Sequence, residues 1–328
     1  GSESQIDEYS TLTVLNDTQR LKAISIVKKI LDKSGEIKEE DLNYREQAVT
    51  RMMKGMGMLR QITLSPYLLS CRKASGKEPT YIEYVESSPK LMYSISCIKS
   101  VHDYEESIGI RKTGNVLYMN IGVNPKAVVP YGDKIGEFID KDGNTQDLFD
   151  YKQISWNNGG FEKIKQYFVN RLGYSEDEVV IVSGGTGNAQ KEKAKNSFLS
   201  GKATVLIGSS TISTGIDLQN NASSLFMCAF DWNPTDNEQI SGRIHRQGNP
   251  RAQIRIVYPM VYDSIDPIIF QILQEKTLRI KEVWDKEGNA STLSLKDFDP
   301  AQLKKKLITD PEDRGEFWFE ENTKRLTD

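Results

Sequence analysis

The sequence predicts an α/β fold in which a mainly parallel β-sheet is flanked by helices. Short apolar runs of the length of buried strands alternate with longer segments whose apolar residues recur at helical spacing. Parallel strands need crossover connections, which are usually helices, so this alternation favours a parallel sheet. With 328 residues and 38% hydrophobic content, the chain can bury a sizeable core.

Five short apolar runs predict strands, and the first of them is expected to be buried. One helix is expected before the first strand, and one in each of the two connections between the first three strands. Two more are expected, one before and one after the last strand. The strands are predicted at residues 116–121, 179–182, 203–207, 225–230 and 254–258, and the helices at about 88–104, 161–172, 189–199 and 267–281, with another opening at Gln239.

The chain divides into three predicted parts. Residues 1–87 are expected to form a helical linking segment, because apolar residues between Thr18 and Ile62 recur at helical spacing. The sheet and its helices then occupy residues 88–281, and residues 282–328 form a C-terminal tail. The opening Gly1-Ser2, without an initiator Met, is typical of an expression scar, so the natural protein is expected to continue upstream.

An insertion is predicted at about residues 124–160, because this connection is much longer than usual. Within it, Asp142-Gly143 lies between two apolar pairs and predicts a hairpin turn. The acidic run from Asp140 is similar to a calcium loop, but Gly143 falls at the fourth position instead of the sixth. Tyr151 also stands where the bidentate Glu should be, so a calcium site is not expected.

Composition excludes several classes of protein. No apolar run is long enough to span a bilayer, so no membrane partner is expected. Three separated cysteines fit buried thiols in a reducing, intracellular compartment. Two distant histidines and the lack of a Gly-x-Ser-x-Gly motif argue against a metal site and against a Ser-His-Asp hydrolase. A net charge of −3 means that any nucleic acid must bind to a local face.

The strongest chemical signal is the segment from Gln239 to Gly248. Gln239, Arg243 and Arg246 are spaced by four and three residues, which predicts that they share one helical face. Two guanidinium groups presented in this way can clamp the oxygens of a transferring γ-phosphoryl group. Taken alone, this pattern of two arginines would more simply be a solvated helix face. The neighbouring segments decide between the two interpretations.

A hydroxyl-rich loop follows the strand predicted at 203–207. It lies at the carboxyl edge of the predicted sheet, where open α/β sheets bind their ligands. Short hydroxyls and free backbone N–H groups suit contacts with phosphate, although many Ser/Thr-rich loops have no such role. Thr186 precedes another predicted helix, whose N-terminus and lysines could also attract phosphate. The hydroxyl-bearing residues of the loop are Ser209, Ser210, Thr211, Ser213 and Thr214.

Taken together, these segments resemble the motifs of superfamily-two helicases, and of their Swi/Snf branch in particular. Residues 239–248 resemble motif VI, and residues 211–218 resemble motif V. Asp231-Trp232-Asn233-Pro234 resembles the Asp-Trp-Asn-Pro of the Swi/Snf branch, and the turn at 183–186 its Asp-Gly-Ser-Thr turn. The resemblance covers roughly residues 59–276, interrupted by the insertion, and includes the entering segments 59–62, 66–69 and 88–91.

The resemblance implies a RecA-like fold and the second ATPase lobe of a DNA translocase, with duplex DNA as a partner. Arg243 and Arg246 would act as arginine fingers, which makes the chain half of a nucleic-acid-dependent ATP hydrolase. The residues implied to face the nucleotide are Gly215, Asp217 and Gln239, and those implied to contact the DNA backbone are Thr186, Ser210, Thr211, Ser213 and Thr214.

Two elements of an ATPase are missing from the sequence. It contains no Gly-x-x-x-x-Gly-Lys-Ser/Thr loop and no Asp-Glu pair placed after a predicted strand. ATP and Mg²⁺ are therefore expected to be bound mainly by the first RecA-like lobe of the same parent protein, which becomes a partner of this chain. The isolated fragment is expected to be inactive.

Several residues depart from the Swi/Snf pattern. Ser183 and Gly242 stand where that branch has Asp, Lys191 and Ser210 stand where it has Arg, and Asp217 replaces Asn. Gly242 and Asp217 are closer to superfamily-two helicases in general. Two alternatives therefore stay open: a lobe of a strand-separating RNA or DNA helicase, and a non-catalytic docking lobe.

Overall fold

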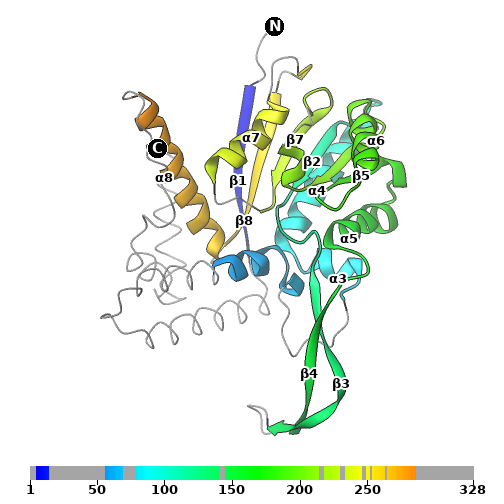
Figure 1. Cartoon of the computed structure of the whole chain (residues 1–328). Helices are drawn as coiled ribbons and strands as arrows, with labels where there is room; N and C mark the ends of the chain where they lie inside the picture. Colours follow the sequence, from blue (N-terminus) through cyan, green and yellow to red (C-terminus); the bar gives the residue numbers. More distant parts are fainter. Residues whose placement is uncertain are drawn as a thin grey trace.

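The computed structural model describes nine segments of the chain: residues 5–14, 56–68, 78–139, 145–213, 218–229, 233–245, 249–251, 253–262 and 264–285. Figure 1 shows one body built around a twisted sheet, with a long two-stranded ribbon that projects from it. In these segments, no helix combines the length and the apolar character needed to cross a membrane.

The sheet has six strands in the order β1-β8-β7-β2-β6-β5, and every pairing within it is parallel. The predicted α/β fold with a parallel sheet is therefore confirmed. Five of the strands lie within a few residues of the predicted apolar runs. The strands are β1 (Gln5–Val14), β2 (Gly114–Tyr118), β5 (Val179–Val182), β6 (Val205–Gly208), β7 (Ala222–Met227) and β8 (Gln253–Tyr262).

Helices cover both faces of the sheet (Figure 1). The helices predicted at 88–104, 161–172, 189–199 and 267–281 are present, and the one expected at 161–172 is an α-helix that continues as a π-helical turn. The helix expected to open at Gln239 begins earlier, at Pro234. A further helix occupies residues 56–64 and is called helix 56–64 below. The others are α3 (Tyr81–Glu86), α4 (Pro89–Ser107), α5 (Gly160–Gln166) with η2 (Tyr167–Arg171), α6 (Asn188–Leu199), α7 (Pro234–Ile244) and α8 (Ile265–Asp285), with short 3-10 turns η1 (Pro66–Leu68), η3 (Glu176–Glu178) and η4 (Ser210–Ser213).

Two hydrophobic clusters, one on each face of the sheet, form the core. In β2, Val116 and Tyr118 pack into the cluster beneath α6, α7, α8 and helix 56–64, whereas Leu117 packs into the cluster beneath α3, α4 and α5. All three side chains have no exposed area. Because successive residues of a strand point to opposite faces, burial of both faces explains the continuous apolar runs in the sequence.

Strand β1 corrects one expectation. Residues 1–87 were expected to be a helical linking segment, but Gln5–Val14 form an edge strand that pairs in parallel with β8. The segment therefore contributes to the sheet as well as to the helices. Of the helical region expected between 18 and 62, residues 56–62 lie in the described helix, and residues 17–55 lie outside the described segments.

The predicted insertion is a separate two-stranded antiparallel sheet. Its strands are β3 (Lys126–Ile139) and β4 (Thr145–Ser155), with Ile139 opposite Thr145. This register fits the predicted hairpin, whose turn at Asp142-Gly143 falls in residues 140–144, outside the described segments. The hairpin projects from the body at the end of β2 (Figure 1).

The base of the hairpin is tightly packed. The Trp156 amide donates to the Pro125 carbonyl at 3.1 Å, and the Trp156 ring meets Tyr84 edge-on with ring centroids 5.6 Å apart. A Cβ atom on Gly160 would lie 2.3 Å from the Gly122 carbonyl oxygen and 2.6 Å from the Tyr84 hydroxyl. Only glycine fits this approach of the two chain segments, so the hairpin has a rigid base.

Candidate nucleotide and nucleic-acid site

The loop after β6 forms a compact 3-10 turn, η4. The Ser209 amide donates to the Val182 carbonyl at 3.1 Å, which ties the loop to the end of β5. The Ser213 hydroxyl donates to the Ser210 carbonyl at 2.6 Å, and its residue is 9% exposed. Ser210 is exposed and Thr211 is half-buried. The loop therefore presents Ser210 and Thr211 outward and uses the Ser213 hydroxyl to hold its own shape.

The turn after β5 lies against this loop. The Thr186 amide donates to the Ser183 carbonyl at 3.1 Å, and the Thr186 hydroxyl accepts from the Ser183 amide at 3.1 Å. A Cβ atom on Gly184 would be 4.0 Å from the Thr211 hydroxyl oxygen. The two hydroxyl-rich segments that the sequence singled out are therefore neighbours at the carboxyl ends of β5 and β6.

Helix α7 begins at a well-defined cap. The Asn233 side-chain oxygen accepts from the Thr235 amide at 3.2 Å, and Pro234 occupies the first turn, where its missing N–H is not needed. Ile240 and Ile244 are buried against the sheet, while Gln239 on the other side is exposed. The capping role of Asn233 was not predicted, although an Asn-Pro pair before a helical segment is the signal that could have shown it.

Arg243 is the residue that joins α7 to the loop after β6. Its Nε atom donates to the Ser213 carbonyl at 2.9 Å, and its own carbonyl accepts from the Leu218 amide at 3.0 Å. Arg243 is half-buried. Arg243 is therefore hydrogen-bonded to the residue before and to the residue after 214–217, the segment where the sequence places the rest of motif V.

Four predicted site residues, Thr214, Gly215, Asp217 and Arg246, lie outside the described segments. Helix α7 ends at Ile244, so it carries Gln239 and Arg243 but stops before Arg246. Gln239 and Arg243 are four residues apart on this helix, as predicted, and the prediction for Arg246 lies outside the described residues. Among the described residues, no group of three or more His, Cys, Asp or Glu side chains is placed to hold a metal ion.

The helices and loops of this site coincide with a known domain. Residues 154–248 match the family described as helicase conserved C-terminal domain. This segment is therefore similar to helicase C-terminal domains. It contains β5, β6, β7 and α7, so the match spans the turn at 183–186, η4 and Arg243. By sequence, no curated protein matches the chain.

Solved structures show the same fold over nearly the whole chain. The C-terminal part of the Fun30 ATPase domain aligns over 95% of this chain and all of its own, with a TM-score of 0.56 and 14% identity. The Sulfolobus solfataricus SWI2/SNF2 ATPase C-terminal domain aligns over 92% and 97%, with a TM-score of 0.54 and 12% identity. The RecA-like fold that the helicase motifs implied is confirmed.

A third similar structure extends well beyond the region that aligns with this chain. The Sulfolobus solfataricus SWI2/SNF2 ATPase core in complex with dsDNA aligns over 94% of this chain but over 49% of its own length, with a TM-score of 0.55 and 13% identity. At these identities the likeness establishes the fold. In architecture, this chain therefore corresponds to about half of that core.

Proposed function

We propose that this chain is the second ATPase lobe of an ATP-dependent DNA translocase of the Swi/Snf type. The observation that carries the proposal is the bond between Arg243 and the Ser213 carbonyl. It places a guanidinium group beside the hydroxyl-rich loop after β6, with the Thr186 turn next to that loop. Groups suited to nucleotide phosphates and groups suited to a DNA backbone thus lie side by side.

In this proposal, ATP and Mg²⁺ are bound mainly by a first RecA-like lobe, and the present lobe closes onto the nucleotide. Arg243 and Arg246 contact the phosphates, and Gly215, Asp217 and Gln239 face the nucleotide. Guanidinium groups stabilise the charge that spreads over the γ-phosphoryl oxygens during transfer. Hydrolysis then releases the closure, as in other domain movements around a ligand.

The DNA backbone would be contacted by the two neighbouring hydroxyl-rich segments. Ser210 and Thr211 face outward and Thr186 lies beside them, which suits phosphate contacts. Ser213 is a weaker candidate because its hydroxyl donates within the loop and its carbonyl accepts from Arg243. Thr214 completes the set on sequence grounds. The dsDNA complex of a structure with this fold supports a duplex as the partner.

The central test is ATP turnover by the intact protein. Arg246→Ala is expected to lower kcat by something on the order of 10³ while changing ATP affinity much less, because an arginine finger acts mainly in the transition state. Lys at this position should not restore the rate, since a point charge cannot replace the planar fork. Turnover within a few-fold of wild type would contradict the assignment.

The matched control is Arg171→Ala. Arg171 follows α5 on the opposite face of the sheet, and its side chain is 59% exposed, so its removal should leave turnover unchanged. Duplex DNA, single-stranded DNA and RNA should be compared as activators. Stimulation by duplex DNA supports a translocase, whereas stimulation only by single strands or RNA would favour the strand-separating helicase. No stimulated turnover would favour the docking lobe.

A further inference from the structure

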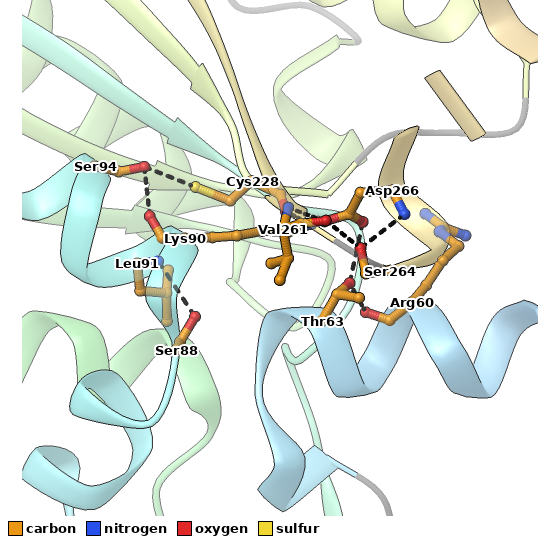
Figure 2. Close-up of polar contacts among 10 residues, drawn as sticks. All are labelled: Arg60, Thr63, Ser88, Lys90, Leu91, Ser94, Cys228, Val261, Ser264 and Asp266. Atoms are coloured by element: carbon orange, nitrogen blue, oxygen red, sulfur yellow. Dashed lines mark hydrogen bonds and ion pairs between the residues drawn. The ribbon is translucent and has the colours of Figure 1, made fainter. Parts of the chain in front are cut away.

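A buried ion pair lies in the core near the carboxyl ends of β7 and β8. Lys90, in the first turn of α4, and Asp266, in the first turn of α8, approach to 2.7 Å, and each side chain is only 2% exposed (Figure 2). The sequence pointed to Lys90 only as part of a linking motif, and Asp266 gave no signal. Neither residue belongs to the candidate site described above.

Each partner of the pair also holds another part of the chain. The Lys90 ammonium donates to the Cys228 carbonyl at 3.1 Å, at the end of β7. The Asp266 carboxylate accepts from the Val261 amide of β8 at 3.0 Å and from the Thr63 hydroxyl at 3.1 Å. One ion pair therefore joins two adjacent strands to α4, α8 and helix 56–64, as Figure 2 shows.

The surroundings of the pair are buried. Ser94 donates from its hydroxyl to the Lys90 carbonyl at 2.8 Å and lies 3.4 Å from the Cys228 sulfur. Burial raises the pKa of the Cys228 thiol to about 11, so this group stays neutral and the counter-charge of Lys90 is the Asp266 carboxylate. Burying two charges is costly, and well-packed apolar residues often give equal or greater stability. Apolar residues could not make the directional hydrogen bonds that Lys90 and Asp266 make.

The carbonyl held by Lys90 begins the connection to α7. Cys228 ends the last backbone-bonded part of β7, with its own amide donating to the Tyr118 carbonyl at 2.9 Å. The chain then reaches Asn233, the cap of α7, and α7 carries Arg243 to the Ser213 carbonyl. Because Cys228 precedes Asn233 by only five residues, we expect a shift at Cys228 to move the start of the helix that bears Arg243.

We propose that Lys90 and Asp266 are positioning residues, which hold the end of β7 and thereby set the place of α7 and Arg243 for turnover. This inference rests on the proposed function. A merely stabilising pair could be replaced by a neutral one without loss of activity once stability is recovered. A positioning pair could not, because the Cys228 carbonyl would lose its donor.

The test uses the double variant Lys90→Met/Asp266→Asn in the intact protein. Each single change leaves one buried charge unpaired and should lower the melting temperature strongly. The double variant removes both charges and should regain most of the melting temperature. Its kcat for DNA-stimulated ATP hydrolysis should nevertheless stay about tenfold below wild type, with KM for ATP within about threefold.

The matched control is Lys99→Met/Asp103→Asn, which removes a solvent-exposed ion pair from the same helix. It should change neither melting temperature nor kcat. A Lys90→Met/Asp266→Asn protein with recovered stability and wild-type kcat would overturn the positioning role. If that variant does not fold, Lys90→Arg keeps both charges but changes the geometry of the donor at the Cys228 carbonyl. It should then lower kcat about threefold, and an unchanged kcat would equally overturn the inference.

Amide hydrogen exchange separates this inference from the proposed function. In the folded double variant, exchange should become faster over residues 233–245 and stay unchanged over α6, whether or not the protein hydrolyses ATP. A wild-type protein without DNA-stimulated turnover would contradict the proposed function. Unchanged exchange over residues 233–245 would contradict the positioning role alone.

Discussion

His102 is a fully buried histidine whose two ring nitrogens are both engaged. Nδ1 lies 2.8 Å from the Tyr174 hydroxyl, and Nε2 lies 2.8 Å from the Thr113 carbonyl. The Thr113 carbonyl can only accept, whereas the Asn115 side-chain nitrogen, 2.9 Å from Nε2, is a donor, so the two contacts of Nε2 favour opposite tautomers of the ring. Burial lowers the pKa of His102 and outweighs the opposing effects of the Thr113 hydrogen bond and the Glu105 charge. The folded protein therefore favours the neutral imidazole.

This environment predicts a pH-dependent stability. Below about pH 6.5, His102 becomes protonated in the unfolded chain but stays neutral in the folded chain. The free energy of unfolding should therefore fall as the pH is lowered. The nearby charged groups are Glu105, Lys112 and Glu178. Urea unfolding at about pH 7.5, 6.5 and 5.5 measures the effect. His102→Gln removes the titrating group and should be less stable at the highest pH but show a shallower decline.

An equally steep decline in His102→Gln would show that another group titrates in this range. The carboxylates whose pKa is lowered, including Glu83 and Asp177, lose their contribution only at lower pH, because their ordinary pKa values are near 4. The chosen pH range therefore isolates the histidine.

Among the elements, the hairpin β3–β4 is the most independent. It forms its own sheet and shares no strand pairing with the six-stranded sheet. Replacing residues 126–155 by a short Gly-Ser turn should lower the melting temperature by no more than a few degrees, because Pro125 and Trp156 are already hydrogen-bonded neighbours. Thermal unfolding and circular dichroism of the shortened chain check this expectation. Loss of the cooperative transition would show that the hairpin is part of the core.

The base of the hairpin should behave in the opposite way. Gly160→Ala places a Cβ atom 2.3 Å from the Gly122 carbonyl oxygen, a contact that requires the backbone to move, and should destabilise the protein by about 1–3 kcal/mol. The matched control is Gly57→Ala, in helix 56–64, where nothing lies within 4 Å of the added atom. It should stabilise by about 0.5–1 kcal/mol through helix propensity. Equal effects at the two positions would contradict the packing described here.

The elements that the sequence predicted well are those buried on both faces. Runs such as residues 203–207 are continuous and apolar because neither side of the strand meets water. β1 was missed because Gln5–Val14 mixes charged, hydroxyl and apolar side chains and lies at the edge of the sheet. In a strand, Ile6, Glu8, Ser10 and Leu12 share one face, and this mixture of apolar and polar residues gives only a weak strand signal. The pairing of β1 with β8 also depends on residues far away in the chain.

The candidate site was predicted only in part, because local motifs give the position of its residues but not their contacts across the fold. Local motifs placed the hydroxyl-rich loop and Arg243 at the carboxyl end of β6 and on α7, where the structure has them. The contact between the loop and Arg243 could be inferred from the order of the motifs only by reference to the known helicase fold. The pairing of Lys90 with Asp266 could not be predicted, because two charged residues on different helices carry no local signal of burial.

For the whole molecule, the proposed function predicts that this chain alone does not hydrolyse ATP. The sequence lacks the loop that cradles phosphates and the carboxylate pair that holds magnesium, so ATP should bind weakly and turn over at background rate. Phosphate release by the purified chain checks this. Arg243→Ala, purified identically, controls for contaminating ATPases. Turnover that the wild-type chain shows and this variant lacks would contradict the prediction.

The pairing of β1 with β8 also has a consequence for biosynthesis. Gln5 lies opposite Gln253 and Val14 opposite Tyr262, so β1 leaves the ribosome long before its partner exists. Until then its unpaired backbone is an aggregation hazard, and closing so long a loop is slow. Truncated chains that stop before Gln253 would keep that hazard permanently. Among the described strands, the first to be synthesised can therefore pair only after the last one has been made.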